Sequence, residues 1–227
     1  MQESASLETV IISIIVFGLP ATLFLTAVGL ILGFGLGLIL ALMRVYGTME
    51  LQWIAEGYEK ILRGIPIIVL MFIFGWGLPN IFWFLPAELR TLAGVILSLS
   101  LRSGAYQSQL YRGAILSVSQ GQMLAAQSIG MSLMQASRHI VLPQALRLAV
   151  PGFSNEYAVV IKDSSFASAV GIQEMFRLAQ GQIAVSPIFL FPVMLVVAFV
   201  YLIFTMPVTN IIAERQTKKL RSLGLGG

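Results

Sequence analysis

Three long stretches of this chain carry no charged side chain, and they constrain its fold more than any other feature. Residues 9–43, 64–87 and 178–213 contain no aspartate, glutamate, lysine or arginine. Each is long enough to cross a bilayer, because a helix needs about 20 apolar residues to span the hydrocarbon core. Of the 227 residues only 11% are charged, against about a quarter in soluble domains, so we predict an integral membrane protein.

The residues that are missing or rare exclude several kinds of chemistry. The chain has no cysteine and one histidine, His139, so it offers no disulfide framework, thiolate or imidazole cluster. It also lacks the G-x-x-x-x-G-K-[ST] motif that cradles nucleotide phosphates. We expect no metal or cofactor in this chain and no enzymatic activity of its own. Its net charge of +4 comes from dispersed residues, so nucleic acid is not an expected partner.

The apolar pattern predicts one all-α transmembrane domain over residues 1–227, with five membrane-spanning helices. The spans are residues 22–43, 61–76, 91–111, 145–161 and 187–212, and the second has an alternative start at Trp53. Before the first span, residues 7–21 are apolar and reach Pro20, which predicts a kinked or interfacial lead-in on the outer side. Residues 112–144 are too polar and too broken by glycine and proline to span.

The distribution of lysine and arginine predicts the orientation of these spans. Placing residues 44–63, 112–147 and 214–227 on one side gives that side ten of the 14 basic residues. Cytoplasmic loops carry the excess of basic residues in membrane proteins. We therefore expect an outside N-terminus and a cytoplasmic tail over residues 214–227.

Small residues recur every four positions along the first predicted span, at Gly29, Gly33, Gly37 and Ala41. This spacing places them on one helix face, where another backbone can approach closely. We interpret the face as a packing seam between helices of one subunit, with a dimer interface as the alternative.

The polar segment 119–130 has the signals of a short helix. Ser119 and Gln122 have capping-box spacing, Gly130 is a typical C-terminal stop, and Ser132 with Gln135 repeats the start signal. These signals predict a cytoplasmic helix, a tight turn and a second helix that enters the fourth span. From the residues alone, the short helix transmits motion to a soluble partner or lies on the lipid headgroups.

Charged and polar residues inside the third and fourth spans predict a site within the membrane. An arginine at the centre of a span costs about 2.5–3.5 kcal/mol, so Arg102 should face a partner or a wet cavity. The expected substrate-binding and translocation residues are Ser98, Arg102, Tyr106, Asn155, Glu156, Asp163 and Ser164. The alternatives are an Arg102–Glu156 ion pair that only fixes helix register, and a local Lys162–Asp163 pair that caps the fourth span.

Several motifs resemble those of one transporter family. Residues 121–130 and the run Ile140-Val141-Leu142-Pro143 resemble the EAA loop of the membrane subunits of ATP-binding cassette (ABC) importers. Other motifs are similar to those of the polar amino acid permeases, which import histidine, glutamine, arginine or glutamate. These motifs are Arg63-Gly64-Ile65-Pro66, Ser103-Gly104-Ala105-Tyr106, Arg112-Gly113-Ala114-Ile115, Leu142-Pro143-Gln144-Ala145-Leu146-Arg147, Asn155-Glu156 and Lys162-Asp163-Ser164-Ser165.

The resemblance implies a fold, a function and a set of partners. It implies the type I ABC importer permease fold in a prokaryotic cytoplasmic membrane, and alternating access driven by ATP and Mg²⁺ bound to two separate cytoplasmic ATPases. A second permease subunit and an external amino acid binding protein complete the assembly. The implied ATPase-coupling residues are Gly121, Met123, Leu124, Ala125, Ala126 and Gly130.

The chain departs from the family pattern at Leu124, where the loop usually carries glutamate, at Gln109, where the family often has glutamate, and at Arg102, a position more often aromatic or neutral. A gradient-driven amino acid carrier and a scaffold that transports nothing remain as alternatives.

Overall fold

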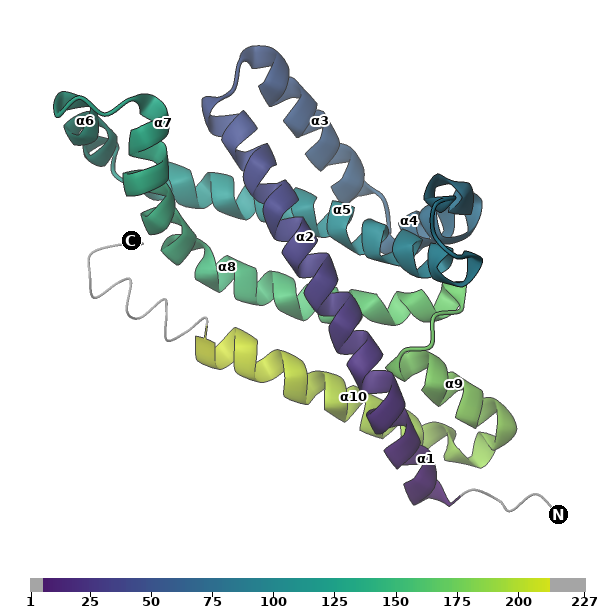
Figure 1. Ribbon diagram of the computed structural model, residues 1–227. Helices are drawn as coiled ribbons and strands as arrows, with labels where there is room; N and C mark the ends of the chain where they lie inside the picture. The colour runs from purple at the N-terminus through teal and green to yellow at the C-terminus, as the bar shows by residue number, and fades with distance from the viewer. Residues whose placement is uncertain (1–5, 213–227) are drawn as a thin grey trace.

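The computed structural model describes residues 6–212, and every regular element within that range is helical (Figure 1). The α-helices are α1 (Leu7–Ser13), α2 (Leu19–Tyr46), α3 (Met49–Gly64), α4 (Ile67–Phe72), α5 (Ala87–Ser117), α6 (Gln120–Ser128), α7 (Leu133–Ala136), α8 (Leu142–Asp163), α9 (Met175–Val185) and α10 (Leu190–Met206). Wider π-helical turns cover Ile14–Gly18, Ile73–Gly77, Ser137–Val141 and Pro207–Ile212, and 3₁₀ turns cover Pro79–Phe82, Ser164–Val170 and Pro187–Phe189. The predicted tail over residues 214–227 lies outside the described residues.

The first helical segment begins earlier than the sequence predicts. Leu7–Tyr46 is one helical run of 40 residues, so the predicted lead-in over residues 7–21 is continuous with the first span instead of being a separate segment. A π-helical turn over Ile14–Gly18 comes just before Pro20. Such turns relax the backbone hydrogen-bond ladder, and a proline, which has no N–H, can then sit within a continuous helical run.

The second predicted span is divided by a sharp bend. Helices α3 and α4 meet at 98°, so residues 61–76 are not one straight helix, and residues 44–63 are mostly helix α3 instead of a loop. Pro66 explains the bend, because proline disfavours helical geometry at the preceding residue, and Ile65 is extended with φ −92° and ψ 128°. Trp53 on α3 is 66% exposed, whereas Ala55 and Glu59 are buried against the other helices.

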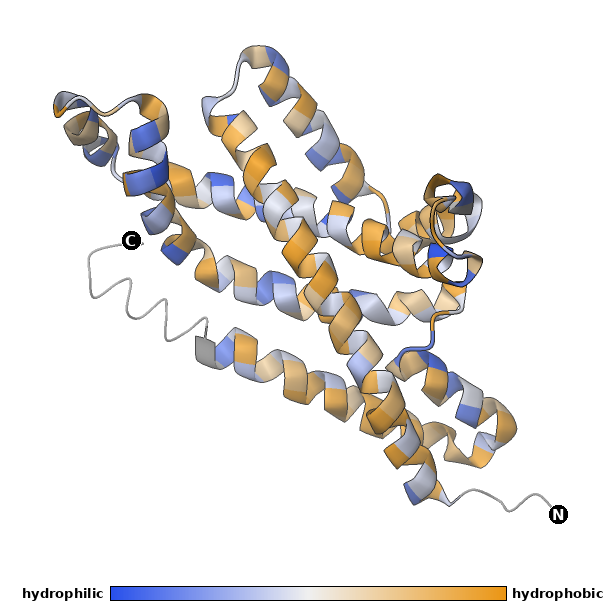
Figure 2. Cartoon of the chain, viewed as in Figure 1, coloured by the Kyte–Doolittle hydropathy of each residue, from blue (hydrophilic) through white to orange (hydrophobic). Residues whose placement is uncertain are grey.

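Within residues 6–212, two helical runs are long and apolar enough to cross a membrane, Leu7–Tyr46 and Pro187–Asn210, and the bent α3–α4 pair is a third if it counts as one span. Helices α5 and α8 contain the predicted third and fourth spans but are more polar, as Figure 2 shows. Several polar residues in the middle of α5 are buried between helices; among them are Ser98, Ser103, Gln107 and Ser108. Because these side chains face protein, average hydropathy underestimates how well α5 suits a membrane.

Helix α2 crosses both α5 and α8 (Figure 1), and small residues of α2 lie close to the backbone of α5. A Cβ atom added at Gly37 would lie 2.8 Å from Cβ of Gln107 and 2.9 Å from the Gly104 carbonyl oxygen. Gly33 faces the same stretch of α5. The predicted seam therefore packs helices of one subunit, which confirms that interpretation.

The core consists of three buried clusters along the molecule. The first joins α1, α9 and α10, the second joins α2, α4, α5 and α8, and the third joins the C-terminal ends of α2 and α5 with the start of α8. Representative members are Ile14, Met175 and Val193; Leu25, Met71, Leu99 and Val160; and Ala41, Tyr111, Ile115 and Val141. Helix α5 belongs to two of the three clusters and holds three of the seven predicted site residues, while α8 holds three others.

Candidate functional site

An ion pair between Arg102 on α5 and Asp163 at the end of α8 forms the centre of the candidate site. The guanidinium Nη1 donates to a carboxylate oxygen of Asp163, and the two side chains are 16% and 13% exposed. Tyr106 lies one turn along α5, and its ring centroid is 4.8 Å from Cζ of Arg102. Three residues predicted from the sequence, Arg102, Tyr106 and Asp163, are therefore brought together.

Arg63 approaches the same tyrosine from α3. Its Cζ lies 5.0 Å from the ring centroid of Tyr106. Helix α3 is joined to α5 nearby, because Tyr58 on α3 donates a hydrogen bond to the Leu101 carbonyl oxygen on α5 over 2.7 Å. Sequence reasoning did not include Arg63 among the site residues, although it lies in the Arg63-Gly64-Ile65-Pro66 motif.

Both ion pairs considered as alternatives are absent from the described residues. Glu156 does not pair with Arg102; its Oε1 accepts a hydrogen bond from the Ser103 hydroxyl over 2.9 Å. Lys162 forms no ion pair within residues 6–212, because Asp163 faces Arg102. Glu156 is only 4% exposed, so it lies in the interior while Arg102 and Asp163 lie nearer the surface.

A chain of buried hydrogen bonds continues from Glu156 along α5. The Ser103 hydroxyl accepts from Nε2 of Gln107 over 2.9 Å, and Tyr111 donates to Oε1 of Gln107 over 2.7 Å. Nε2 of Gln107 also donates to the Leu30 carbonyl oxygen on α2 over 3.2 Å. The sequence contained a signal for this chain, since residues 103, 107 and 111 recur every four positions on one helix face.

The remaining predicted residues do not join the cluster. Ser98 is buried and donates to its own helix at the Gly94 carbonyl oxygen, and Ser164 donates in the same way to Ile161 over 2.7 Å. Asn155 is exposed and faces away from Glu156. Adjacent helix positions point about 100° apart, which separates Asn155 from its neighbour.

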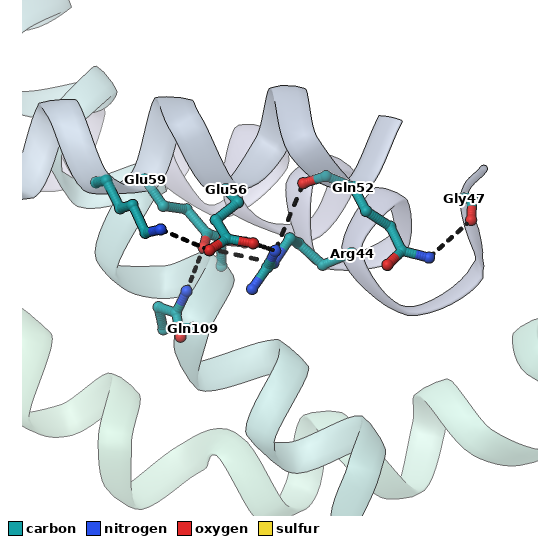
Figure 3. Close-up of polar contacts among 8 residues, drawn as sticks. Arg44, Gly47, Gln52, Glu56, Glu59 and Gln109 are labelled. Carbon is teal, nitrogen blue, oxygen red and sulfur yellow. Dashed lines mark hydrogen bonds and ion pairs between the residues drawn. The ribbon is translucent and has the colours of Figure 1, made fainter. Parts of the chain in front are cut away.

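A second polar junction ties α2, α3 and α5 together (Figure 3). Glu59 on α3 is only 1% exposed, and it accepts hydrogen bonds from Ser108 over 2.5 Å and from Gln109. Arg44 on α2 lies 3.7 Å from Glu59 and pairs with Glu56 over 2.5 Å. Gln109 therefore serves as a neutral donor to a buried carboxylate, which a glutamate at this position cannot do while ionised.

Glu174 caps helix α9 and was missed by sequence reasoning. Its carboxylate accepts from the backbone N–H groups of Phe176 over 2.9 Å and Arg177 over 2.7 Å, and from the Thr22 hydroxyl over 3.3 Å. Burial raises the pKa of Glu174 to about 7, although the backbone donors act in the opposite direction. Through Thr22, Glu174 fastens the connection between α8 and α10 to α2.

The short helix predicted over residues 119–130 is present as α6 and ends at Gly130 as predicted, but the capping box expected from Ser119 and Gln122 does not form. Ser119 accepts from the backbone N–H of Gly121 over 3.3 Å, and Ser132 and Gln135 form a complete capping box at α7. Gly130 has φ +89°, its N–H donates to Gln127, and the N–H of Met131 donates to Ala126. This pair of bonds is a Schellman motif, which requires a left-handed residue at position 130.

The predicted coupling residues divide between two faces of α6. Ala126 is buried and Met123 half-buried, and Met123 packs against the cluster that contains Val118 and Val141. Gly121, Ala125 and Gly130 are exposed, and Leu124 is 63% exposed. Ile129 and Met134, which sequence reasoning missed, are 80% and 75% exposed. The exposed face of α6 and the turn after it is therefore uncharged, because residues 113–137 contain no charged side chain.

An apolar groove of about 530 Å³ runs between α2 and α8, lined by residues that include Leu30, Phe34, Phe153 and Tyr157. Its lining contains none of the charged residues described above, so it is distinct from the Arg102 cluster. Within residues 6–212 no group of three or more His, Asp or Glu side chains is arranged to hold a metal ion.

Comparisons with known proteins agree on one family. The sequence pattern of the family described as "Binding-protein-dependent transport system inner membrane component" matches residues 33–222. The chain is 37% identical over 188 residues to the probable amino-acid permease protein YxeN of Bacillus subtilis, which covers 82% of this chain and 83% of that protein. It is 34% identical over 196 residues to the probable glutamine ABC transporter permease protein GlnM of the same organism, covering 85% and 87%.

A solved structure has the same arrangement of helices. A chain from the crystal structure of an amino acid ABC transporter with histidines superposes with a TM-score of 0.75 and 28% sequence identity. The match covers 92% of this chain and 94% of that one. The similarity therefore extends over nearly the whole length of both chains.

Proposed function

The chain belongs to the family of binding-protein-dependent transport system inner membrane components, as a permease subunit of an amino acid ABC importer, and we propose how its residues serve that transport. In this family ATP hydrolysis belongs to separate ATPase subunits. Membership of the family implies partnership with ATPase subunits, permease subunits and a binding protein.

We propose that the chain crosses the membrane five times, through the Leu7–Tyr46 run, the bent α3–α4 pair, α5, α8 and α10. Basic residues support the orientation, since residues 112–147 and 214–227 carry seven of the 14 lysines and arginines and belong inside by the positive-inside rule. The N-terminus and helix α9 are then outside, and α6, α7 and the tail over residues 214–227 are cytoplasmic.

The proposed transport path rests on one observation: the ion-paired side chains of Arg102 and Asp163 are partly exposed at the surface of the chain. Both side chains retain surface exposure within helices that lie in the membrane, and Arg63 nearby is exposed. Charged groups are too costly to face lipid, so they face water or a protein partner. This surface therefore lines the path of the amino acid, and a second permease subunit, identical or homologous, closes it.

Helix α6 is the proposed contact with the ATPases. It lies at the end of the molecule opposite α9 (Figure 1), where the proposed orientation puts the cytoplasm. Leu124 and Ile129 are exposed there, and their burial in an ATPase groove would remove apolar surface from water. Two cytoplasmic ATPases, using ATP and Mg²⁺, then move the paired permeases between outward-open and inward-open states, and an external binding protein delivers the amino acid.

Purification of the tagged chain with its partners tests this proposal. We expect an ATPase to co-purify in mild detergent, and its hydrolysis to rise with one amino acid plus the associated binding protein. Arg102→Gln should lower this stimulation, whereas Lys60→Gln, which changes an exposed side chain of α3 outside the cluster, should leave it unchanged. A chain that purifies without an ATPase would refute the proposal, as would full stimulation in the Arg102→Gln complex.

A further inference from the structure

Two arginines share the ring of Tyr106, but only one of them has an acidic partner. Arg102 and Arg63 lie 4.8 and 5.0 Å from the ring centroid, and Arg102 pairs with Asp163. Arg63 forms no ion pair within residues 6–212. Two guanidiniums gathered on one ring repel each other, so this arrangement has a surplus of positive charge that an anion would neutralise.

The ion pair between Arg102 and Asp163 is chemically complementary to an amino acid zwitterion. An α-carboxylate can replace Asp163 as the partner of Arg102, and an α-ammonium can replace Arg102 as the partner of Asp163. The exchange keeps both protein charges paired, so it avoids the large cost of leaving a charge unpaired away from water. Arg63 has no role in that exchange and remains available for a second acidic group.

From these contacts we propose that Arg63, Arg102, Tyr106 and Asp163 bind an amino acid that carries a second carboxylate. Asp163 holds the ammonium, Arg102 holds the α-carboxylate, and Arg63 holds the second carboxylate, while both guanidiniums stack on Tyr106. Arginine suits this role because its planar fork bonds a carboxylate through two N–H groups and also stacks on an aromatic face. This inference rests on the proposed function and specifies the substrate class of the same site.

Binding measurements without the binding protein test the inference, because they isolate the selectivity of the permease. The probes are glutamate and its neutral analogue glutamine, titrated into the permease–ATPase complex in lipid nanodiscs. We expect glutamate to bind about tenfold or more tightly than glutamine, since a hydrogen bond between two charged groups is stronger than one to a neutral amide. In the Arg63→Gln complex the two affinities should become similar through a loss of glutamate binding alone.

Two further variants keep the test specific. Lys60→Gln removes a neighbouring cation of α3 that is 74% exposed and pairs with Glu56, so it should leave the preference for glutamate unchanged. Arg63→Lys keeps the charge without the planar fork and should retain part of the preference.

A wild-type complex that binds both amino acids equally, or binds neither, would overturn the inference. An Arg63→Gln complex that is assembled and keeps the full preference would also overturn it. These failures are distinct from failure of the proposed function, because a co-purifying ATPase stimulated by another amino acid would leave the importer intact and remove only the two-carboxylate site.

Discussion

The hydroxyl of Ser103 on α5 donates a hydrogen bond to Oε1 of Glu156 on α8 over 2.9 Å. Glu156 is buried, and the adjoining bonds through Gln107 extend to Tyr111 on α5 and to the backbone of α2. The acid therefore acts as a polar anchor among three helices. Its neighbour on the helix face, Asp163, pairs with an arginine at the surface instead.

Replacement of Glu156 tests the anchoring role. Glu156→Ala should lower the free energy of unfolding by about 1–3 kcal/mol, because it leaves buried polar partners without an acceptor. Glu156→Gln retains an acceptor oxygen and should cost less. The measurement is thermal unfolding of the purified complex, with Asn155→Ala as an exposed control that changes little. Unchanged stability of Glu156→Ala together with lost transport would assign Glu156 to the substrate path instead.

Gly37 tests the close packing of α2 on α5. Gly37→Ala should destabilise the protein by about 1–3 kcal/mol, since overpacking of a tight interface forces neighbouring groups to move. The added Cβ would lie 2.8 Å from Gln107, whereas nothing lies within 4 Å of a Cβ at Gly35. Gly35→Ala is therefore the matched control and should be neutral or slightly stabilising. Equal thermal midpoints for the two variants would contradict the seam.

Sequence periodicity and capping signals were sufficient to predict much of the fold. The predicted third, fourth and fifth spans lie within α5, α8 and the Pro187–Ile212 run, and α6 ends at Gly130 in the left-handed conformation that a Schellman motif needs. These features are local, since each depends on residues a few positions apart. The bend between α3 and α4 was missed despite Pro66, because an apolar run that continues across a proline was interpreted as one span.

Pairing between helices was the part that the sequence could not predict. Glu156 and Asp163 share one face of α8 and are separated by about 10.5 Å along the axis. Which of them meets Arg102 depends on how α5 and α8 are offset, and that offset follows from tertiary packing. Arg63 was missed for the same reason, because only the contact of α3 with α5 brings it to Tyr106.

The turn after α6 should be necessary for coupling hydrolysis to transport. Gly130→Pro removes the N–H that donates to Gln127 over 2.9 Å and forces φ to a negative value, so the Schellman motif cannot form. We expect the variant to insert and assemble, and to hydrolyse ATP with strongly reduced uptake. Gly130→Asn is the control, because asparagine tolerates the left-handed conformation. Normal uptake by Gly130→Pro would argue against α6 as the coupling element.

Glu174 should make stability depend on pH. Its pKa is raised from 4.5 to about 7 because it is buried. Between these values the folded chain binds a proton that the unfolded chain releases, so the free energy of unfolding should fall as pH rises through this window. The decrease should reach roughly 3 kcal/mol. Thermal unfolding of the complex between pH 5 and 7.5 measures it.

The control for this titration is Glu174→Gln, which is uncharged like the protonated side chain and keeps one acceptor oxygen for the two N–H groups of Phe176 and Arg177. The stability of the variant should stay nearly constant from pH 5 to 7.5 while that of the wild type falls, because the variant has no carboxylate to ionise in a buried place. The difference between the two profiles isolates Glu174 from every other titrating group. Parallel profiles over this range would mean that the backbone N–H groups hold Glu174 ionised, and that the cap, instead of burial, controls its charge.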